Sequence, residues 1–502
     1  MEACKDYFKY LNESEEVICL ENVTFSYQSD KKPIISNINL SIKYGEFIVF
    51  MGESGCGKTT MTRIINGLAL KFYEGEMNGN IRILNKNIND YASWEIGKFV
   101  GSIFQDPKSQ FFASITEDEI AFGCENYGLE YNKIKDRVFE SIKIINGMDL
   151  IGKEIYPMSS GEKQKIAIAS VNSVNPMIYV FDEPSANLDM NSVELLKKLM
   201  HSLKDAGHTV IVAEHRLYYL ADLADKFIYL KDGQVEMEMT SKEFMNINED
   251  KRRKLGIRSC DLKKITFNVP QSSVNKLETL SVKDLAFYYK RGCYVFNNVS
   301  FKAYAGNIIA ICGHNGAGKT TLSKILCGIK KEKHGDILYS GKKISYKKRK
   351  NNAYFVMQNT DCSLFGDSAE NELRLNKKNA DDKYIDKILM DYNLLSYKKN
   401  HPSSLSGGQK QRLSLAVSDV IDYDILILDE PTSGLDYKNM CNISNHIREL
   451  SAKGKTILII THDYEFAAMT CNKVLHFISS DKIEMFDLAN NHKRLFDCFM
   501  SK

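Results

Sequence analysis

The 502-residue sequence lacks several features that would define its class at once. No stretch approaches the roughly 20 apolar residues that a membrane-spanning helix needs, and the first residues contain no apolar segment typical of a signal peptide. The 12 cysteines form no CxxC pair, which favours reduced thiols over a disulfide framework or a zinc site. The formal net charge is only +3, so bulk charge indicates no nucleic-acid partner. Any membrane role is therefore expected to be peripheral.

An internal repeat organises what is present. The spacing between matching landmarks falls from 261 residues to 253 and then stays at 247, so the second copy is shorter before its later landmarks. The matching pairs, in chain order, are Lys58 and Lys319, Gln105 and Gln358, Ser159 and Ser406, Asp182 and Asp429, and His215 and His462.

The repeat predicts two domains, at residues 1–245 and 276–502, joined by a linker at 246–275. The linker sequence is charged, contains Pro270 and shows no sustained periodicity. Its basic run at 251–254 is interpreted as part of a solvated connector; contact with nucleic acid or anionic lipid is the alternative. Within each domain, short apolar strands alternate with helical patterns, which predicts an α/β core with a mainly parallel sheet.

Two glycine-rich loops match the pattern G-x-x-x-x-G-K-[ST], each after an apolar run and before a helical pattern. Such loops point backbone N–H groups at phosphate, and the following helix presents its positive N-terminus. Lys58 and Lys319 are predicted to reach the β- and γ-phosphates of a nucleotide, and Thr59 and Thr320 to bind Mg²⁺. The predicted nucleotide-binding residues are Gly52, Glu53, Ser54, Gly55, Cys56, Gly57, Lys58, Thr59 and Thr60 in the first copy, and Gly313, His314, Asn315, Gly316, Ala317, Gly318, Lys319, Thr320 and Thr321 in the second.

Acidic pairs follow a later apolar strand in each copy. Asp182 and Asp429 are predicted metal ligands, and the next residue, Glu183 or Glu430, is predicted to polarise the attacking water. One strand further along, His215 and His462 are predicted to sense the γ-phosphate. Gln105 and Gln358 lie between the phosphate loop and these strands, where an amide contacts both metal and water.

With these motifs assembled, the chain resembles the ATP-binding-cassette (ABC) superfamily over nearly its whole length. The most diagnostic segment is a signature loop, LSGGQ at 405–409 and the variant MSSGE at 158–162. The resemblance implies two tandem P-loop NTPase domains, each with a mainly parallel sheet core, an antiparallel β subdomain and a helical subdomain. It also implies an ATPase that uses ATP and Mg²⁺.

In the family, each signature loop faces the nucleotide of the other domain, as a helix N-terminus binds an anion. The resemblance therefore implies that Ser406, Gly408 and Gln409 complete the first site, and that Ser159 and Gly161 complete the second. Ser160 and Glu162 depart from the family pattern, so we expect both sites to bind ATP and the second to be slower.

Tyr27 and Tyr289 match the family's aromatic residue that stacks on adenine. Each follows a phenylalanine in a strand-like run, so a core or edge aromatic is the alternative.

The segments after the two glutamines resemble the ATPases of energy-coupling-factor (ECF) importers, which take up vitamins or metal ions. This resemblance implies integral membrane partners, namely a coupling protein and a substrate-binding component, and a peripheral position on the cytoplasmic side of the cell membrane. One hypothesis is that Glu117, Asp118, Glu119, Glu370 and Glu372 receive arginines of the coupling protein. The alternative is that these acids favour a helix N-terminus.

Two other functions stay open. A sugar-type importer also uses fused tandem ATPases, and a ribosome-associated ABC ATPase also combines tandem cassettes with a Gly-Glu signature. The short linker, broken by Pro270, and the intact Gln409 favour the importer over the ribosome factor.

Overall fold

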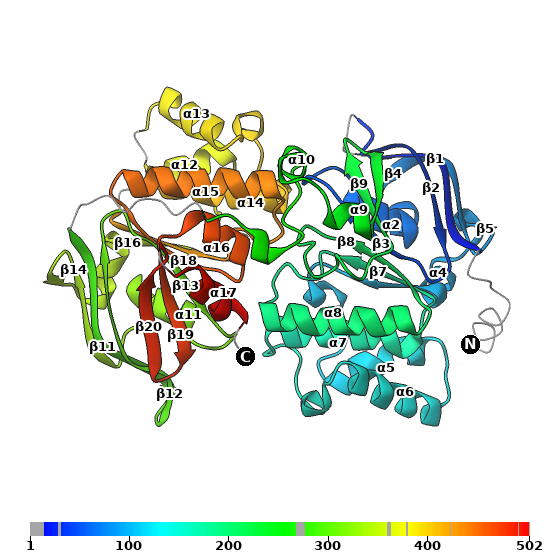
Figure 1. Cartoon of the computed structure of the whole chain (residues 1–502), viewed down its shortest axis with the longest axis horizontal. Coiled ribbons are helices and arrows are strands. Elements are labelled where there is room, and N and C mark those ends of the chain that lie inside the picture. The colour runs from blue at the N-terminus through cyan, green and yellow to red at the C-terminus, as the bar shows by residue number, and fades with distance from the viewer. Residues whose placement is uncertain are drawn as a thin grey trace. The chain divides into compact units, whose positions relative to one another are not determined.

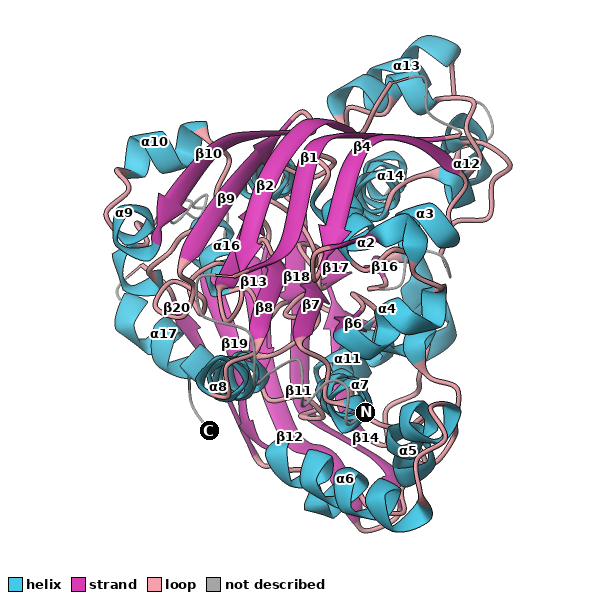
Figure 2. Cartoon of the chain, turned by 90° about the vertical axis from the view of Figure 1, so that its right-hand side faces the viewer, coloured by secondary structure: helices cyan, strands magenta, loops and turns pink. Residues whose placement is uncertain are grey.

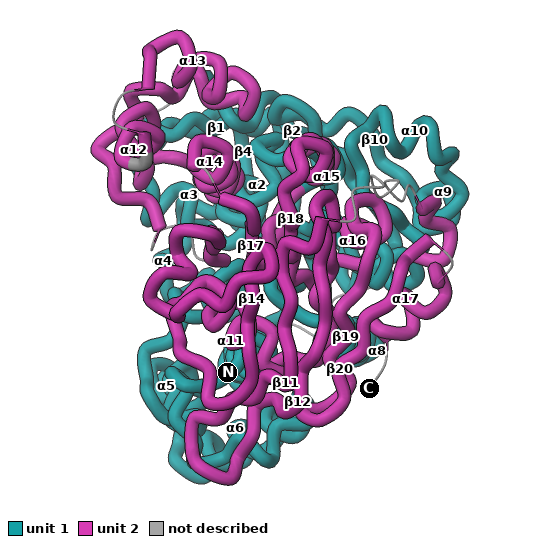
Figure 3. The backbone as a smooth tube through the Cα atoms, turned by 90° about the vertical axis from the view of Figure 1, so that its left-hand side faces the viewer, with its two compact units in different colours: residues 1–261, 436–438 teal, residues 262–435, 439–502 magenta. Residues whose placement is uncertain are grey.

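The computed structural model describes residues 15–28, 32–267, 277–358, 363–377, 380–421, 423–489 and 491–500. The chain forms two compact units, residues 1–261 with 436–438 and residues 262–435 with 439–502 (Figure 3). Among the residues just given, each unit holds one six-stranded and one four-stranded sheet; Figure 1 labels their strands. The expected α/β class is confirmed. No helix within the described ranges is both long and apolar enough to cross a membrane.

The elements of the first unit are β1 (Glu16–Tyr27), β2 (Ile35–Lys43), β3 (Phe47–Met51), α2 (Lys58–Ile65), α3 (Leu68–Lys71), β4 (Gly75–Ile83), β5 (Lys86–Asn87), η1 (Ile88–Asp90), α4 (Ser93–Phe99), β6 (Val100–Ile103), η2 (Pro107–Gln110), α5 (Thr116–Asn126), α6 (Tyr131–Ile144), η3 (Met148–Leu150), α7 (Ser160–Val174), β7 (Ile178–Asp182), α8 (Met190–Asp205), β8 (Thr209–Ala213), β9 (Lys226–Lys231), β10 (Gln234–Thr240), α9 (Ser241–Met245) and α10 (Glu249–Lys254).

The elements of the second unit are η4 (Leu262–Lys264), β11 (Glu278–Lys290), β12 (Cys293–Tyr304), β13 (Ile308–Gly313), α11 (Lys319–Leu326), β14 (His334–Tyr339), β15 (Lys342–Lys343), η5 (Tyr346–Asn351), β16 (Ala353–Val356), α12 (Ala369–Asn376), α13 (Asp382–Asp391), η7 (Leu395–Tyr397), η8 (Pro402–Ser404), α14 (Gly407–Val420), β17 (Ile425–Asp429), α15 (Tyr437–Ala452), β18 (Thr456–Ile460), α16 (Tyr464–Thr470), β19 (Lys473–Ser479), β20 (Lys482–Asp487) and α17 (His492–Met500).

The six-stranded sheet of the first unit has the order β10-β9-β3-β8-β7-β6. Its pairs are parallel except β9 with β10. All five residues of β3, FIVFM, are buried, as expected for a central strand of a parallel sheet covered on both faces. Because the phosphate loop leaves the carboxyl end of β3, the sheet places it beside the ends of β7 and β8.

The second unit repeats this arrangement, with the order β16-β17-β18-β13-β19-β20 and one antiparallel pair, β19 with β20. Here β13 is the central strand and leads into the second phosphate loop.

Each four-stranded sheet is antiparallel, β2-β1-β4-β5 in the first unit and β12-β11-β14-β15 in the second. Figure 2 shows β2, β1 and β4 side by side. Alternate residues of β1 face the core, and the aromatic residue at the end of each long strand lies beside the phosphate-loop helix. The helices α5, α6 and α7 pack on one another in the first unit, and α12, α13 and α14 do so in the second.

Part of the segment expected as a linker folds with the first unit. It contains α10, and Ile257 belongs to the buried core of that unit. Arg252, within the basic run, is buried and pairs with Glu249, whereas Lys251, Arg253 and Lys254 are exposed. Residues 268–276, which include Pro270, lie outside the described ranges.

Candidate nucleotide sites

The first phosphate loop has the backbone that its glycines permit. Gly52 and Gly57 have φ angles of 149° and 104°, a region that favours glycine. A Cβ on Gly52 would lie 2.2 Å from the Leu230 carbonyl oxygen, so a side chain is excluded there. Lys58 Nζ donates to the carbonyl oxygens of Gly52 and Glu53 at 3.0 and 3.1 Å. The lysine thus lies across the mouth of the loop, where a β/γ-phosphate would sit.

The second loop repeats this geometry. Gly313 and Gly318 have φ angles of 145° and 98°, and Lys319 Nζ donates to the carbonyl oxygens of Gly313 and His314 at 2.6 and 2.9 Å. The remaining predicted loop residues form the turn between strand and helix in each unit, namely Ser54, Gly55 and Cys56 in the first and Asn315, Gly316 and Ala317 in the second.

Each phosphate-loop threonine meets the aspartate at the end of the strand two places along in its sheet, β7 in the first unit and β17 in the second. Thr59 Oγ1 donates to Asp182 Oδ1 at 3.0 Å, and Thr320 Oγ1 donates to Asp429 Oδ2 at 3.2 Å. Burial raises the pKa of both carboxyls, and the threonine hydroxyl opposes this shift. One hydroxyl and one carboxylate are hard oxygen donors, which fit Mg²⁺ bound together with a nucleotide's phosphates and water. In the described parts of the chain, no group of three or more acidic, His or Cys side chains gathers as a metal cage.

Glu183 lies at the centre of the first site. Gln105 Nε2 donates to its Oε2 at 2.7 Å, and His215 Nε2 lies 3.5 Å from its Oε1. Burial raises the pKa of Glu183 to about 8, and burial together with the Lys58 charge lowers that of His215 well below its ordinary value. A carboxyl with a pKa near the working pH is suited to accept a proton from water. A neutral imidazole beside it can orient that water or a phosphate oxygen.

Glu430 and His462 repeat the pair in the second unit. His462 Nε2 lies 3.6 Å from Glu430 Oε1, and the His462 backbone N–H donates to Glu430 Oε2 at 3.3 Å. Gln358 follows β16 and is exposed.

Both glutamates share a strained backbone. Their φ angles are 44° for Glu183 and 50° for Glu430, a left-handed conformation that costs roughly 1–2 kcal/mol for a residue with a side chain. Their backbone N–H groups donate to the carbonyl oxygens of Ala213 and Ile460 at 2.8 and 2.9 Å. The turn after each strand is therefore fixed, and it directs the carboxylate to the histidine.

The signature loops form helix N-termini. Ser159 caps α7 and Ser406 caps α14, each with a reciprocal capping box to the third residue of its helix. A Cβ on Gly161 would lie 2.9 Å from Ser192 Oγ, and one on Gly408 would lie 3.5 Å from Leu435 Cδ2. Both helix ends thus offer backbone N–H groups and a serine hydroxyl.

The two departures in the first signature are accommodated without loss of the cap. The Glu162 carboxylate accepts from the Ser159 N–H and hydroxyl at 2.9 and 2.7 Å, as the Gln409 oxygen accepts from the Ser406 N–H at 2.8 Å. The hydrogen bonds from Ser159 lower the pKa of Glu162, so it carries a full negative charge near neutral pH. The Ser160 hydroxyl donates to the Asn187 carbonyl oxygen at 3.1 Å.

The two tyrosines predicted to stack on adenine lie beside the phosphate-loop helices. Tyr27 OH is 3.4 Å from Thr60 Oγ1, and Tyr289 OH is 3.2 Å from Thr321 Oγ1. Tyr289 is 60% exposed. Adenine stacking stays a prediction.

Arg63 was not among the predicted site residues. Its guanidinium donates to Tyr27 OH at 3.0 Å, and its guanidinium carbon lies 4.3 Å from the centre of the Tyr73 ring. Its position on the phosphate-loop helix, one turn after Thr59, could have indicated from the sequence that Arg63 lies near the nucleotide site. A cavity of about 710 Å³ begins beside these residues; Thr59, Asp182, Gln105, Arg63, Phe72, Tyr73 and Phe112 are among its lining.

Comparison with known proteins identifies the family. The family profile described as "ABC transporter" matches residues 35–186 and 296–433. The chain belongs to the ABC transporter family. A Treponema denticola relative named "Putative ABC transporter ATP-binding protein" is 42% identical over 473 residues, covering 93% of this chain and 96% of the relative.

A second ABC relative is the Bacillus subtilis "Putative HMP/thiamine import ATP-binding protein YkoD", which is 31% identical over 491 residues, 92% of this chain and 90% of its own length. Among solved structures, the archaeal ribosome recycling factor aABCE1 superposes with a TM-score of 0.64 at 20% identity, covering 96% of this chain and 92% of that one. This last likeness shows the fold alone.

Family membership gives the two sites their chemistry. The protein is an ABC ATPase that binds ATP with Mg²⁺ and hydrolyses it. Bound Mg²⁺ neutralises phosphate charge, and Thr59 with Asp182, and Thr320 with Asp429, would hold it. Lys58 and Lys319 stay the predicted ligands of phosphate oxygens, and Glu183 and Glu430 stay the predicted acceptors of the proton of the attacking water.

Proposed function

We propose that this ABC ATPase energises an ECF-type importer of a micronutrient, through closure of its two domains around two ATP molecules. Its work requires integral membrane partners, and the chain would lie on the cytoplasmic face of the membrane beside them. The thiamine-import name of the Bacillus subtilis relative supports the vitamin-import branch of the family.

The observation that carries the proposal is an aromatic residue presented at matching places after each glutamine. Phe112 and Phe365 each lie seven residues after Gln105 and Gln358 and are 77% and 78% exposed. Single exposed apolar residues are common on protein surfaces, so it is the recurrence of an exposed phenylalanine at the same place in both copies that favours a protein partner.

A buried glutamate fixes each of these loops. Glu119, 1% exposed, accepts from the N–H groups of Phe112 and Ala113 at 2.8 and 2.7 Å. Glu372, 2% exposed, accepts from the N–H of Phe365 at 2.6 Å and from that of Gly366. Both copies thus use a buried carboxylate to present the aromatic ring.

These contacts change the hypothesis that acids receive the partner's arginines. Glu119 and Glu372 are committed to backbone N–H groups, and Glu117 accepts from the Gly152 N–H through both oxygens, at 2.9 and 2.8 Å. Asp118 is exposed. These contacts shift the proposed docking element from the acids to the aromatic residues.

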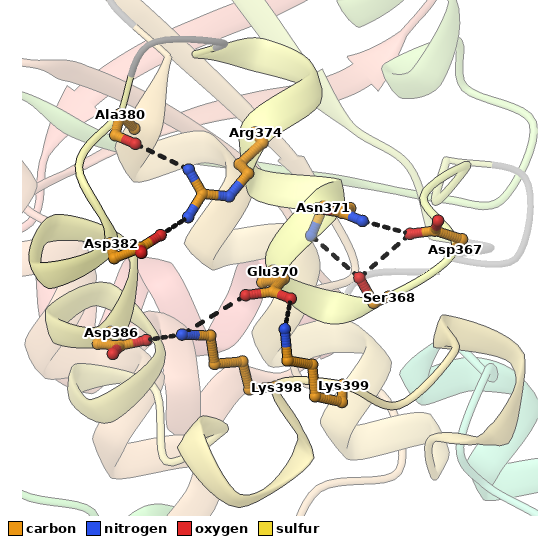
Figure 4. A network of polar contacts seen from close by, with 10 residues as sticks. All are labelled: Asp367, Ser368, Glu370, Asn371, Arg374, Ala380, Asp382, Asp386, Lys398 and Lys399. Carbon is orange, nitrogen blue, oxygen red and sulfur yellow. Dashed lines mark hydrogen bonds and ion pairs between the residues drawn. The ribbon is translucent and has the colours of Figure 1, made fainter.

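The remaining acid of the hypothesis, Glu370, points toward Lys398 and Lys399 (Figure 4). Its Oε2 lies 3.5 Å from Lys398 Nζ, which also meets Asp386 at 2.6 Å, and the Lys399 ammonium pairs with Oε1. The hydrogen bond from Lys399 is the largest cause of a lowered pKa at Glu370, and Lys398 lowers it further. An arriving arginine would have to displace them.

The test is co-purification from membranes. Phe112→Ala and Phe365→Ala together are expected to abolish retention with the membrane subunits and uptake, and Phe365→Ala alone is expected to leave ATP hydrolysis by the isolated chain within about twofold of wild type. Phe139→Ala, at an exposed aromatic on α6, is the matched control. Retention and uptake by the double variant at wild-type levels would refute the docking surface.

The ribosome alternative is separated by fractionation. Recovery of the chain with salt-washed ribosomes, and not with membranes, would replace the importer assignment. The likeness to aABCE1 is at 20% identity and favours neither outcome.

A further inference from the structure

The residues on either side of the two site histidines differ between the copies. At the 247-residue spacing, Glu214-His215-Arg216 corresponds to Thr461-His462-Asp463. A carboxylate precedes the histidine in the first copy and follows it in the second, and an arginine stands in the first copy where the second has that aspartate.

In the first unit, the Glu214 carboxylate joins three segments. Its Oε1 accepts from the N–H groups of His215 and Arg216 at 2.8 and 3.1 Å. Its Oε2 accepts from the Ser185 N–H at 3.3 Å and from Tyr219 OH at 2.9 Å. Glu214 is 2% exposed, so it is a buried charge held by four donors. It links the histidine's own backbone to the loop that begins two residues after Glu183.

Arg216 holds the same loop by its carbonyl groups. Its Nη1 donates to the Ser185 and Leu188 carbonyl oxygens at 3.3 and 3.2 Å, and the side chain is 6% exposed. Burial and the Glu214 charge keep the pKa of Tyr219 well above its ordinary value, so this phenol stays a donor. Loop 185–188 is therefore held by hydrogen bonds at one N–H group, which donates to Glu214, and at two carbonyl groups, which accept from Arg216.

The second unit makes the link with other atoms. Thr432, the counterpart of Ser185, donates its hydroxyl to Asp463 Oδ2 at 3.0 Å. Asp463 Oδ1 accepts from the Phe466 N–H at 3.1 Å, and the Asp463 N–H donates to Thr461 Oγ1 at 3.0 Å. In the second unit, the hydrogen bond between the Thr432 and Asp463 side chains therefore connects the histidine turn to the loop after Glu430.

We propose that Glu214 and Arg216 are positioning residues for hydrolysis in the first unit, a coupled pair that replaces the Thr461–Asp463 pair of the second. They act through His215 and through the loop after Glu183, and neither contacts nucleotide. Because Glu214 and Arg216 act together, replacing one of them by its counterpart breaks the link between the histidine turn and loop 185–188. Replacing both restores that link in the form that the second unit uses. The inference concerns hydrolysis and does not rest on the transport role proposed above.

The test is a double-mutant cycle on the full chain. Glu214→Thr, Arg216→Asp and the double variant are compared for kcat and KM with MgATP, and Glu183→Gln defines the rate that does not depend on Glu183. Each single variant is expected to lose about tenfold of the Glu183-dependent kcat, as misplaced catalytic groups do, with KM changed less than about threefold. The double variant, in which the introduced aspartate can accept from the Ser185 hydroxyl, is expected to recover to within about threefold of wild type.

A general structural role predicts a different pattern, in which losses multiply in the double variant and follow the thermal midpoint. That pattern, or a Glu214→Thr variant with kcat within about twofold of wild type, would overturn the proposal. Glu214→Gln keeps the shape of the side chain and guards against misfolding. It is expected to fold as wild type and to lose about threefold in kcat, since one amide oxygen cannot replace two acceptor oxygens; unchanged kcat would count against the proposal.

Discussion

Removing the Glu119 carboxylate should release the loop that carries Phe112. The carboxylate receives two backbone hydrogen bonds at 2.8 and 2.7 Å, and a hydrogen bond to a charged group contributes about 1.5–3 kcal/mol. Relief of the buried charge offsets part of that gain. We therefore expect Glu119→Ala to lower the free energy of local opening by about 2–4 kcal/mol.

Hydrogen exchange measures this directly. A loss of about 2–4 kcal/mol corresponds to exchange of the Phe112 and Ala113 amides about 30- to 700-fold faster, because about 1.4 kcal/mol is a factor of ten. Asp118→Ala, at an exposed residue in the same helical turn, is the control and should leave both amides unchanged. Glu119→Gln keeps an acceptor oxygen and should fall between the two. Exchange in Glu119→Ala within about threefold of wild type would refute the role given to this carboxylate.

Glu183→Gln and Glu430→Gln, made singly, should each reduce ATP hydrolysis at their own sites by about 10²–10⁴; single-turnover hydrolysis resolved by site checks this, and a wild-type rate at the substituted site would contradict it. Glu162→Gln removes a charge while keeping the cap, so single-turnover hydrolysis at the second site should accelerate, and an unchanged rate would show that Glu162 does not slow it. Glu332→Ala leaves the 1%-exposed Arg349 without its carboxylate and should lower stability by about 3 kcal/mol. Burial raises the pKa of Glu332, but the hydrogen bond from Arg349 outweighs it, and the net pKa is lowered. The difference in melting temperature between wild type and Glu332→Ala should therefore be present at pH 7 and disappear as pH falls well below 4.5. A difference that is constant with pH would contradict the assignment.

The sequence was sufficient for features that local chemistry dictates. The phosphate loops were predictable because glycine conformation and a lysine at fixed spacing define them, and the buried strands because apolar runs mark a covered parallel sheet. Thr59 and Asp182 were both predicted to bind Mg²⁺, and their contact agrees with the carboxyl ends of β3 and β7 meeting at one edge of the sheet.

Other features depend on partners distant in the chain. From the sequence, Glu119 was a candidate to receive a partner's arginine, with a helix-start acid as the alternative, and Glu214 was not singled out. Only tertiary structure brings backbone N–H groups to these two carboxylates. The helix α10 is short and highly charged, so its sequence shows no apolar periodicity. The burial of Arg252 against the first unit was therefore not predictable.

The sandwiching of nucleotide between the two domains is tested most directly by a structure of the Glu183→Gln, Glu430→Gln chain with ATP and Mg²⁺. If the domains close around nucleotide, Ser406 Oγ will lie about 3 Å from the γ-phosphate held by Lys58, and Ser159 Oγ equally close to that held by Lys319. Nucleotide bound at both phosphate loops with neither serine within about 6 Å, or met only by serines of a second copy, would contradict it.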